Sequence, residues 1–417
     1  MTQLLLTSLA LVSLIACGSD TPEDSPRTVD ASSDTIRAAV KSNASVASKL
    51  DKLFAEQDGN LFYSPISIEA VSAVLLAGAA GNTASQLGEF LDAGDDPDVM
   101  HEGLGALLAD LRRERSTYTL SLANRLWAEE GLQSSDSFEK TTRDVYDAPT
   151  EYADFANAPN AVRTDINKWV STQTKGKIPE LFRDGQITDL TVIAAVNAIY
   201  FKADWANAFD PKRTGSSAFH RADGTEVDVQ MMMRPKSEAR ASQSENAVWL
   251  ELPYKGKDIS FLAYTHPRDL LDEPHISSVR ELHDSLGELD LDEVVAQLDN
   301  VDDMVVYMPR FSLRSRIDLV PAFKALGVID LFEPNLADLS NIDSTRRVVA
   351  VDPFVHEAIV QVDETGTVAA AATGAGGILL SGSPTVRLDR PFLFFIRDNL
   401  TGAILFSGQV ADPSRED

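Results

Sequence analysis

The last fifth of the chain contains a segment whose residue order strongly limits how it can fold. Residues 357–363 alternate as a strand does, with Ala358, Val360 and Val362 on one face. From Gly366 onward the side chains become small: a threonine and a valine precede four alanines, a second threonine and a run of glycine and alanine. Exposed loops normally use polar, turn-forming residues, and alanine favours helices over strands. These residues suit burial in a narrow slot, although a linker or a helix covering a sheet remains open.

The net charge limits the partners of the chain. Its 417 residues include 64 acids and 37 bases, a formal net charge of −27. Nucleic acids and anionic membrane surfaces bind proteins through clustered lysines and arginines. The best basic cluster, at Arg112, Arg113 and Arg115, is typical of the polar face of a helix. We therefore expect no nucleic-acid partner and no direct binding to lipid headgroups.

The N-terminus has the pattern of an export signal. Residues 1–17 form an apolar run that ends in small residues, and Leu14-Ile15-Ala16-Cys17 resembles the lipobox of bacterial lipoproteins. Cys17 is the only cysteine, so it cannot form an intramolecular disulfide, whereas lipidation would give it a role. No lysine or arginine precedes the apolar run, so plain cleavage or a wrongly assigned start codon remains an alternative.

The segment after Cys17 is predicted to be a tether. Residues 18–34 are rich in Ser, Thr, Asp and Pro, a composition typical of disordered chains. The folded domain is then expected to span residues 35–417. These features predict an exported protein of the cell envelope, held at the outer membrane or cell surface by a lipid on Cys17, with secretion as the alternative.

The spacing of apolar residues predicts mainly helices early in the chain and mainly strands later. Helices are expected at residues 36–56, 66–80 and 162–174, and the second is apolar almost all round, which indicates burial. Strands are expected at residues 61–63, 118–127, 191–201, 305–313, 349–363, 391–396 and 403–410. This order lacks the regular alternation of a doubly wound fold and favours the α+β class.

One amide interrupts the most apolar strand. Residues 192–201 are apolar except for Asn197, and runs of this kind are usually buried on both faces of a sheet. A buried amide destabilises the fold unless its polar atoms are paired. We therefore expect Asn197 to belong to a hydrogen-bonding network; alternatively, it marks a sheet edge or a bulge.

The sequence contains no recognisable catalytic motif. The nucleophile elbow G-x-S-x-G and the phosphate-binding loop are absent, and the glycine-rich run 374–377 opens no helix. His101 and His356 each precede a glutamate but lack the second histidine of a zinc-protease helix. The only thiol, Cys17, lies in the export signal. We expect no enzymatic activity, no metal and no cofactor.

Short residue blocks are spread over the chain from about residue 34 to its end. Among them are Asn60-Leu-Phe-Tyr-Ser64-Pro65-Ile-Ser67-Ile, Leu122-Ala-Asn124-Arg-Leu-Trp127, Asn197-Ala-Ile-Tyr-Phe201-Lys202-Ala-Asp-Trp205, Glu251-Leu-Pro253-Tyr254, Met308-Pro309-Arg-Phe311, Phe354-Val-His356 and Arg390-Pro391-Phe392. In these blocks and their order, the chain resembles the serpins, the serine protease inhibitor family. Each block is weak alone, and together they are specific. The resemblance implies one α+β domain with three β-sheets, about nine helices and an exposed reactive-centre loop.

The resemblance also implies a mechanism. Most serpins inhibit serine proteases, and some inhibit cysteine proteases, by letting the protease cleave the loop, which then inserts as a new strand in the large sheet. Family spacing, sixteen residues on from Glu364, puts the cleaved bond at Leu380–Ser381, or at Leu379 in another register. A bulky aliphatic residue before the cut suits chymotrypsin-like, elastase-like or subtilisin-like enzymes. The implied partner is a protease, and the inhibitor is expected to be a monomer.

The family assigns a hinge to the small-residue segment. Inserted as a strand, Thr367, Ala369, Ala371 and Thr373 would point to one face, and all four are small. The strand is expected to bend out of the sheet at Gly366–Thr367 in the native form. Non-inhibitory serpins often carry bulky, charged or proline residues here, and this chain carries none; a non-inhibitory binding or storage serpin remains the alternative. The implied hinge residues are Glu364, Gly366, Thr367, Ala369, Ala370, Ala371 and Ala372.

Four further residues are implied to control the opening of the large sheet. Ser64, Asn197 and His356 are expected to form a polar cluster between its central strands, and Trp205 to lie where the loop first enters. The plainer interpretation, that all four only hold the fold, is compatible with the same network.

Overall fold

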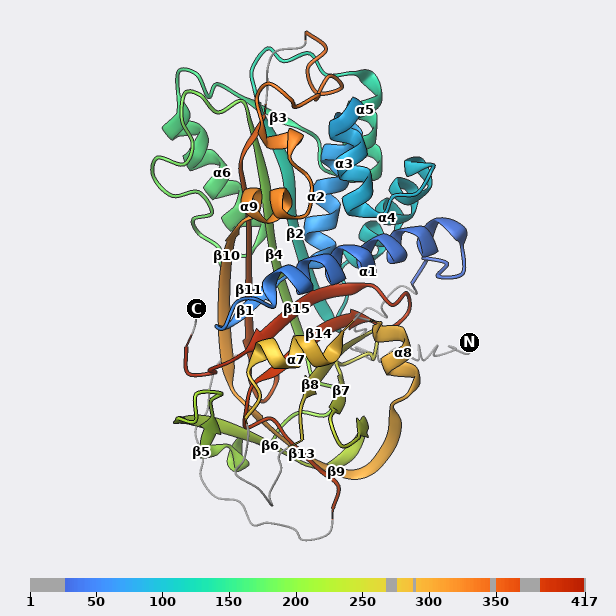
Figure 1. The fold of residues 1–417 in the computed structure, drawn as a ribbon, viewed down its shortest axis with the longest axis vertical. Coiled ribbons are helices and arrows are strands. Elements are labelled where there is room, and N and C mark those ends of the chain that lie inside the picture. Colours follow the sequence, from blue (N-terminus) through green and yellow to red (C-terminus); the bar gives the residue numbers. More distant parts are fainter. Residues whose placement is uncertain (1–26, 268–275, 288–289, 346–349, 368–382, 416–417) are drawn as a thin grey trace, which may run out of the picture.

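A six-stranded sheet built around the apolar run near Asn197 forms the centre of the molecule (Figure 1). The computed structural model describes residues 27–267, 276–287, 290–345, 350–367 and 383–415. The strands of this sheet lie in the order β10-β11-β12-β4-β2-β3, and β11 also pairs directly with β4. Their bounds are β2 (Tyr118–Glu129), β3 (Glu151–Ala153), β4 (Ile193–Asp204), β10 (Phe311–Asp318), β11 (Val351–Val362) and β12 (Gly366–Thr367).

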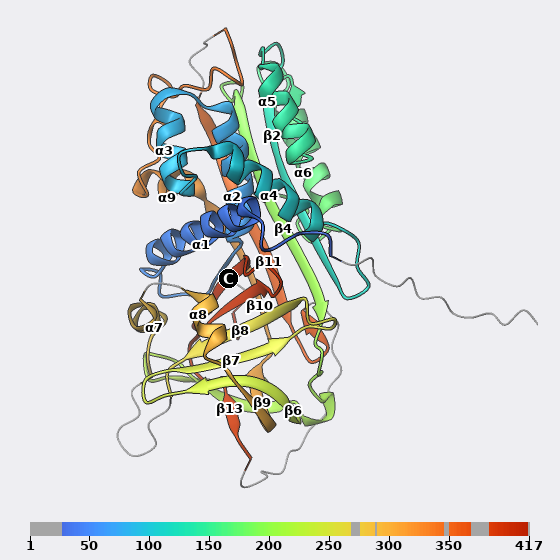
Figure 2. The same ribbon diagram turned by 90° about the vertical axis from the view of Figure 1, so that its right-hand side faces the viewer.

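Strand β4 is buried on both faces, as the apolar run predicts. Alternate side chains of β4, such as Ala195 and Ile199, join the main core, which includes the helix α2 (Pro65–Gly78). The side chains between them pack against the helix α6 (Pro159–Gln173). Figure 2 shows α6 on one side of the sheet and α2 on the other. Any strand added beside β4 would therefore need small side chains on both faces.

The second sheet has nine strands and fills the other half of the molecule. Its order is β1-β15-β14-β8-β7-β6-β9-β13, with β5 paired to β6. Three sheets were expected, but two of them form one continuous sheet here. Hydrogen bonds between β6 and β9 join them, and the register of this pairing shifts twice near Ser237. The bounds are β1 (Leu61–Tyr63), β5 (Gly215–His220), β6 (Glu226–Gln243), β7 (Val248–Pro253), β8 (Ile259–Thr265), β9 (Asp299–Pro309), β13 (Thr385–Arg387), β14 (Phe392–Asp398) and β15 (Ile404–Val410).

Nine α-helices lie within the described ranges, which confirms the predicted α+β class and the expected number of about nine helices. Besides α2 and α6 they are α1 (Asp34–Phe54), α3 (Gly81–Leu91), α4 (Pro97–Leu111), α5 (Asp136–Lys140), α7 (Val279–Leu286), α8 (Leu291–Ala296) and α9 (Leu319–Ala325). A π-helical turn at Thr141–Val145 comes directly after α5, and two 3-10 turns lie at Pro211–Arg213 and Asp330–Phe332. In the described part of the chain, no helix combines the length and the apolar character needed to cross a bilayer.

The structure corrects two boundaries. The predicted strand 305–313 is two strands, β9 and β10, because the chain leaves one sheet at Pro309 and enters the other at Phe311. The predicted tether 18–34 is shorter, because the chain already packs on the folded domain at Arg27. Arg27 is the only basic residue of this segment, and its side chain pairs with Asp110 and Asp398. The remaining tether residues and the signal 1–17 lie outside the described residues.

Candidate functional site

The hinge lies at the end of β11, where the chain reverses and starts a new strand. β11 ends at Val362, and the two residues of β12 run antiparallel between β11 and β4. Thr367 lies opposite both Val362 and Ala203, and Gly366 lies opposite Asp204. Gly366 and Thr367 thus belong to the sheet, and the reversal occupies residues 363–365. The predicted bend out of the sheet at Gly366–Thr367 stays a prediction, because residues 368–382 lie outside the described residues.

Gly366 is needed for close packing of the backbone. A Cβ atom at this position would lie 2.0 Å from the carbonyl oxygen of Ala203 and 2.6 Å from the Cα atom of Asp204. Both atoms belong to the backbone of β4 and cannot move aside without disturbing the strand. Gly366 does not have the positive φ that would by itself favour glycine. The glycine therefore lets β12 enter between its neighbours.

A buried carboxylate holds the reversal. Glu364 is 4% exposed, and both of its oxygens accept a hydrogen bond from Nε of Arg310 at 2.8 Å. The hydroxyl of Thr214 donates to the same carboxylate, and the backbone N–H of Phe209 donates to the carbonyl of Glu364 at 2.9 Å. Charge-assisted bonds from a guanidinium fork are strong and directional. They fix the chain directly before β12.

Trp205 lies beside the hinge, where the sequence placed the entry of the loop. Its backbone N–H donates to the carbonyl of Thr365 at 2.8 Å, and its indole N–H donates to the carbonyl of Asp363 at 2.9 Å. The indole stacks on Tyr254 with ring centroids 4.5 Å apart. The hydroxyl of Tyr254 shares a hydrogen bond of 2.8 Å with the hydroxyl of Thr367, which is 1% exposed. The aromatic pair thus contacts both ends of the reversal.

A buried polar cluster lies farther down the same strands. Asn197 and His356 are register partners on β4 and β11, and the Oδ1 atom of Asn197 accepts a hydrogen bond from Nδ1 of His356. The backbone N–H of Ser64 donates to Nε2 of His356 at 3.1 Å. The side-chain hydroxyl of Ser64 caps α2 by accepting from the N–H of Ser67 at 3.2 Å. The predicted network around Ser64, Asn197 and His356 is therefore present.

The partners of His356 fix its tautomer and its charge. Nε2 accepts from a backbone N–H, so it carries no proton, and Nδ1–H must be the donor to Asn197. The ring is fully buried and has no carboxylate among its hydrogen-bond partners. Burial lowers the pKa of His356 to about 3, because the charged form is desolvated. The cluster is neutral, and it joins β4 and β11 through side chains as well as through their backbones.

Comparison with known proteins identifies the family. A family model described as serpin (serine protease inhibitor) matches residues 41–413. The chain belongs to the serpin family. The leukocyte elastase inhibitor of Homo sapiens is 36% identical over 360 residues, which covers 85% of this chain and 93% of that protein.

Solved structures share the same fold. Uncleaved ovalbumin superposes with a TM-score of 0.78 at 26% identity, covering 91% of this chain and 100% of its own. Thyroxine-binding globulin in complex with thyroxine gives a TM-score of 0.77 at 27% identity, covering 91% of this chain and 99% of its own. These neighbours therefore share the fold over about nine tenths of this chain.

Sequence reasoning missed residues that complete both parts of the site. Ser67 donates to Asn124 at 3.0 Å, and the amide nitrogen of Asn197 donates to Oδ1 of Asn124 at 2.9 Å and to the carbonyl of Ser67 at 2.6 Å. Asn124 is the one polar residue on a face otherwise made of leucines, which is the same signal that singled out Asn197. At the hinge, Thr214 and Arg310 carried no such signal, because charged and hydroxyl residues are common in exposed turns.

Several predicted site residues lie outside the described residues. They are Cys17, Ala369, Ala370, Ala371, Ala372, Leu380 and Ser381.

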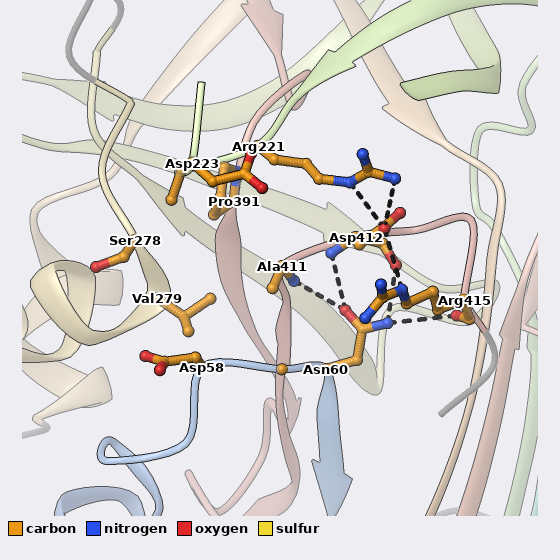
Figure 3. A pocket seen from close by; sticks show the side chains of 12 residues that line it. Asp58, Asn60, Arg221, Asp223, Ser278, Val279, Pro391, Ala411, Asp412 and Arg415 are labelled. Carbon is orange, nitrogen blue, oxygen red and sulfur yellow. Dashed lines mark hydrogen bonds and ion pairs between the residues drawn. The ribbon is translucent and has the colours of Figure 1, made fainter. Parts of the chain in front are cut away.

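One surface hollow of this serpin lies apart from the hinge and the cluster, whereas another is lined in part by Asn124. The former, of about 650 Å³, is lined by residues that include Asp58, Asn60, Arg221, Asp412 and Arg415 (Figure 3). Its polar groups mostly bind one another: Nε of Arg221 donates to Asp412 at 2.8 Å, and Nδ2 of Asn60 donates to the carbonyl of Asp412 at 2.8 Å. No group of three or more His, Cys, Asp or Glu residues in the described ranges could hold a metal ion.

The lowered pKa of His356 predicts a pH dependence of native-state stability. An unfolded histidine binds a proton below a pKa of about 6.5, whereas the native ring stays neutral down to about pH 3. Between these values the unfolded chain binds more protons, so the native state loses stability as the pH falls, by up to about 1.4 kcal/mol per pH unit. Below about pH 6.5, the midpoint of thermal unfolding should drop less steeply in His356→Gln, whose amide can donate to Asn197 and accept from Ser64 without titrating.

The control is His220→Gln, which removes a histidine paired with Glu226 at 2.9 Å on β5. This variant removes a histidine without touching the cluster, so its pH profile should differ from that of the wild type less than the profile of His356→Gln does. Identical profiles for the wild type and His356→Gln would show that His356 does not contribute.

Proposed function

We propose that this serpin is a suicide inhibitor of serine proteases with chymotrypsin-like, elastase-like or subtilisin-like specificity. The protease attacks the bond Leu380–Ser381, the amine of Ser381 leaves, and the carbonyl of Leu380 stays esterified to the protease. The freed segment after Thr367 then enters the six-stranded sheet between β11 and β4 and lengthens β12. Insertion carries the bound protease away from the entry point before water can cleave the ester.

The register of β12 is the observation that carries this proposal. Thr367 lies opposite Ala203 on β4 and opposite Val362 on β11. If the pairing of β12 with β4 continued in the same register, Thr373 would lie opposite Asn197. If the pairing with β11 continued in the same way, Thr373 would also lie opposite His356. Asn197 and His356 are themselves register partners. A lengthened β12 could therefore pair with both neighbouring strands without a change of register. The hydroxyl of Thr373 would then lie where insertion breaks the bond between His356 and Asn197.

The sizes of the entering side chains fit the slot. Thr367 is inward and buried, so Ala369, Ala371 and Thr373 would follow on the same face by strand alternation. That face meets the main core, and the opposite face meets α6. Roughly ten to fifteen new backbone hydrogen bonds at about 0.5 to 1.5 kcal/mol each give a gain on the order of 10 kcal/mol. The native form is then kinetically trapped, with only the first two residues of the strand in place.

The relatives support inhibition without deciding it. A relative named leukocyte elastase inhibitor supports an inhibitory role and an aliphatic specificity. The same fold binds thyroxine in thyroxine-binding globulin, so fold alone does not give the function. The alternative, a binding or storage serpin, does not require small residues throughout the hinge. The buried Thr367 and the alanines that follow therefore favour inhibition.

The hinge predicts a matched pair of variants. Because Thr367 is already buried in the native sheet, Thr367→Arg would either bury an unpaired guanidinium or hold this end of the strand out of the sheet. Insertion of the whole strand would then cost several kcal/mol, so the yield of covalent complex with chymotrypsin should fall at least about tenfold. The exposed neighbour Thr365 offers the control, and Thr365→Arg should inhibit as the wild type does. The complex is measured as an SDS-resistant band, and the mass of the released peptide gives the cleaved bond. Clean cleavage of the wild type at Leu380 without a complex would contradict the proposal.

We also propose that the chain is exported and lipidated at Cys17, on the basis of the lipobox-like residues 14–17 and the absence of any other cysteine. Mass spectrometry of the mature N-terminus should find a diacylated Cys17 as the first residue. Replacing it in Cys17→Ser should move the protein from the membrane fraction to the soluble fraction. A mature N-terminus at another residue, or an unmodified Cys17, would exclude the anchor.

A further inference from the structure

The segment before α1 is attached to the body by one buried arginine. The side chain of Arg27 is 10% exposed, and its guanidinium bonds to Asp110, which is 2% exposed, and to Asp398, which is fully buried. Nη1 donates to one oxygen of Asp398 at 2.5 Å and Nη2 to the other at 3.2 Å, while Nε donates to Asp110. The backbone N–H of Thr28 adds a bond of 3.1 Å to Asp110. This fork geometry is specific to arginine.

Asp110 lies next to the start of β2, in the helix α4, which packs mainly on α1. It lies at the end of α4, and the chain then enters β2 at Tyr118 after a short connection. Arg115 ties the two together, because Nη2 contacts Asp110 at 3.5 Å and Nε donates to the hydroxyl of Tyr118 at 3.1 Å. β2 then pairs with β4 along almost its whole length.

Asp398 belongs to the nine-stranded sheet. It ends β14, which pairs with β15, and β15 pairs with β1. The backbone N–H of Phe62 in β1 donates to the hydroxyl of Ser315 in β10 at 2.8 Å. β10 pairs with β11 along its whole length. The bonds of Arg27 therefore link the connection between α4 and β2 to the end of β14, and Figure 2 shows the segment before α1 passing beside α4.

We propose that Arg27 is a clamp that restrains the opening of the six-stranded sheet and so sets the rate of strand insertion. The clamp rests on the proposed function, because it acts on the same movement. Admitting one strand moves β4 and β11 apart by about 4.8 Å, a distance that exceeds the range of a hydrogen bond. Opening must therefore break the bonds of Arg27 or move Asp110 away from β2, and either change leaves buried charges with fewer partners.

The clamp predicts that removing the side chain of Arg27 speeds strand insertion. Removing an arginine that forms an ion pair away from the six-stranded sheet should not have this effect. A synthetic peptide with the sequence of residues 367–380 is mixed with the purified native protein, and its incorporation is followed by native gel mobility and tryptophan fluorescence. Arg27→Gln should take up the peptide at least about fivefold faster than the wild type, the effect expected from losing one charge-assisted bond. Arg27→Lys, which keeps the charge without the fork, should fall between them and serves if Arg27→Gln does not fold.

The matched control is Arg221→Gln. Arg221 pairs with Asp412 at 2.8 Å (Figure 3), but it joins the turn after β5 to the chain end after β15, so both partners belong to the nine-stranded sheet. Its rate of peptide uptake should stay within about twofold of the wild type, which separates the clamp from general destabilisation.

Equal rates in the wild type and Arg27→Gln, or equal acceleration in Arg27→Gln and Arg221→Gln, would overturn the clamp and leave the proposed function intact. No uptake by any variant, together with no protease complex, would contradict the proposed function and the clamp with it.

Discussion

The parallel pairing of β4 with β11 is the interaction on which the rest of the structure depends. Both strands run in one direction, and they pair directly from Val351 and Ile193 up to Ile359 and Tyr200. Above that point β12 lies between them and is antiparallel to both. Extending β12 would replace one parallel contact by two antiparallel ones, which are slightly more stable per residue. A sheet with a lengthened β12 would therefore be more stable than the sheet of the native form.

In the proposed mechanism, side chains at two levels keep β12 from lengthening spontaneously. At the hinge, Glu364 is held by Arg310 and Thr214, so the reversal cannot slide along β11. Lower down, His356 and Asn197 bridge the two strands at a point where the polar groups on each side have partners. Breaking a satisfied buried network exposes desolvated donors and acceptors until new partners arrive. This transient loss is a barrier to insertion, and the proposed arrival of Thr373 would end it.

The sequence is most informative where one residue breaks a pattern. Asn197 interrupts an apolar strand, and the small residues after Gly366 interrupt a normal one, so the residue order alone marks both parts of the site. The reason for Gly366 could not be foreseen, because the carbonyl of Ala203 that excludes a side chain lies on another strand. The same limit applies to Arg27, whose partners Asp110 and Asp398 are 83 and 371 residues away. In an acidic chain nothing local shows which carboxylates a given arginine will reach.

The central claim is that β4 and β11 can accept the loop as a strand, and cleavage of the loop tests it most directly. The midpoint of thermal unfolding is measured for the intact protein and again after a non-target protease has cut the loop near Leu380. A gain on the order of 10 kcal/mol should raise the midpoint by more than about 10 °C in a domain of this size. An unchanged or lower midpoint after a mapped, complete cut would show that the segment after Thr367 does not enter the sheet.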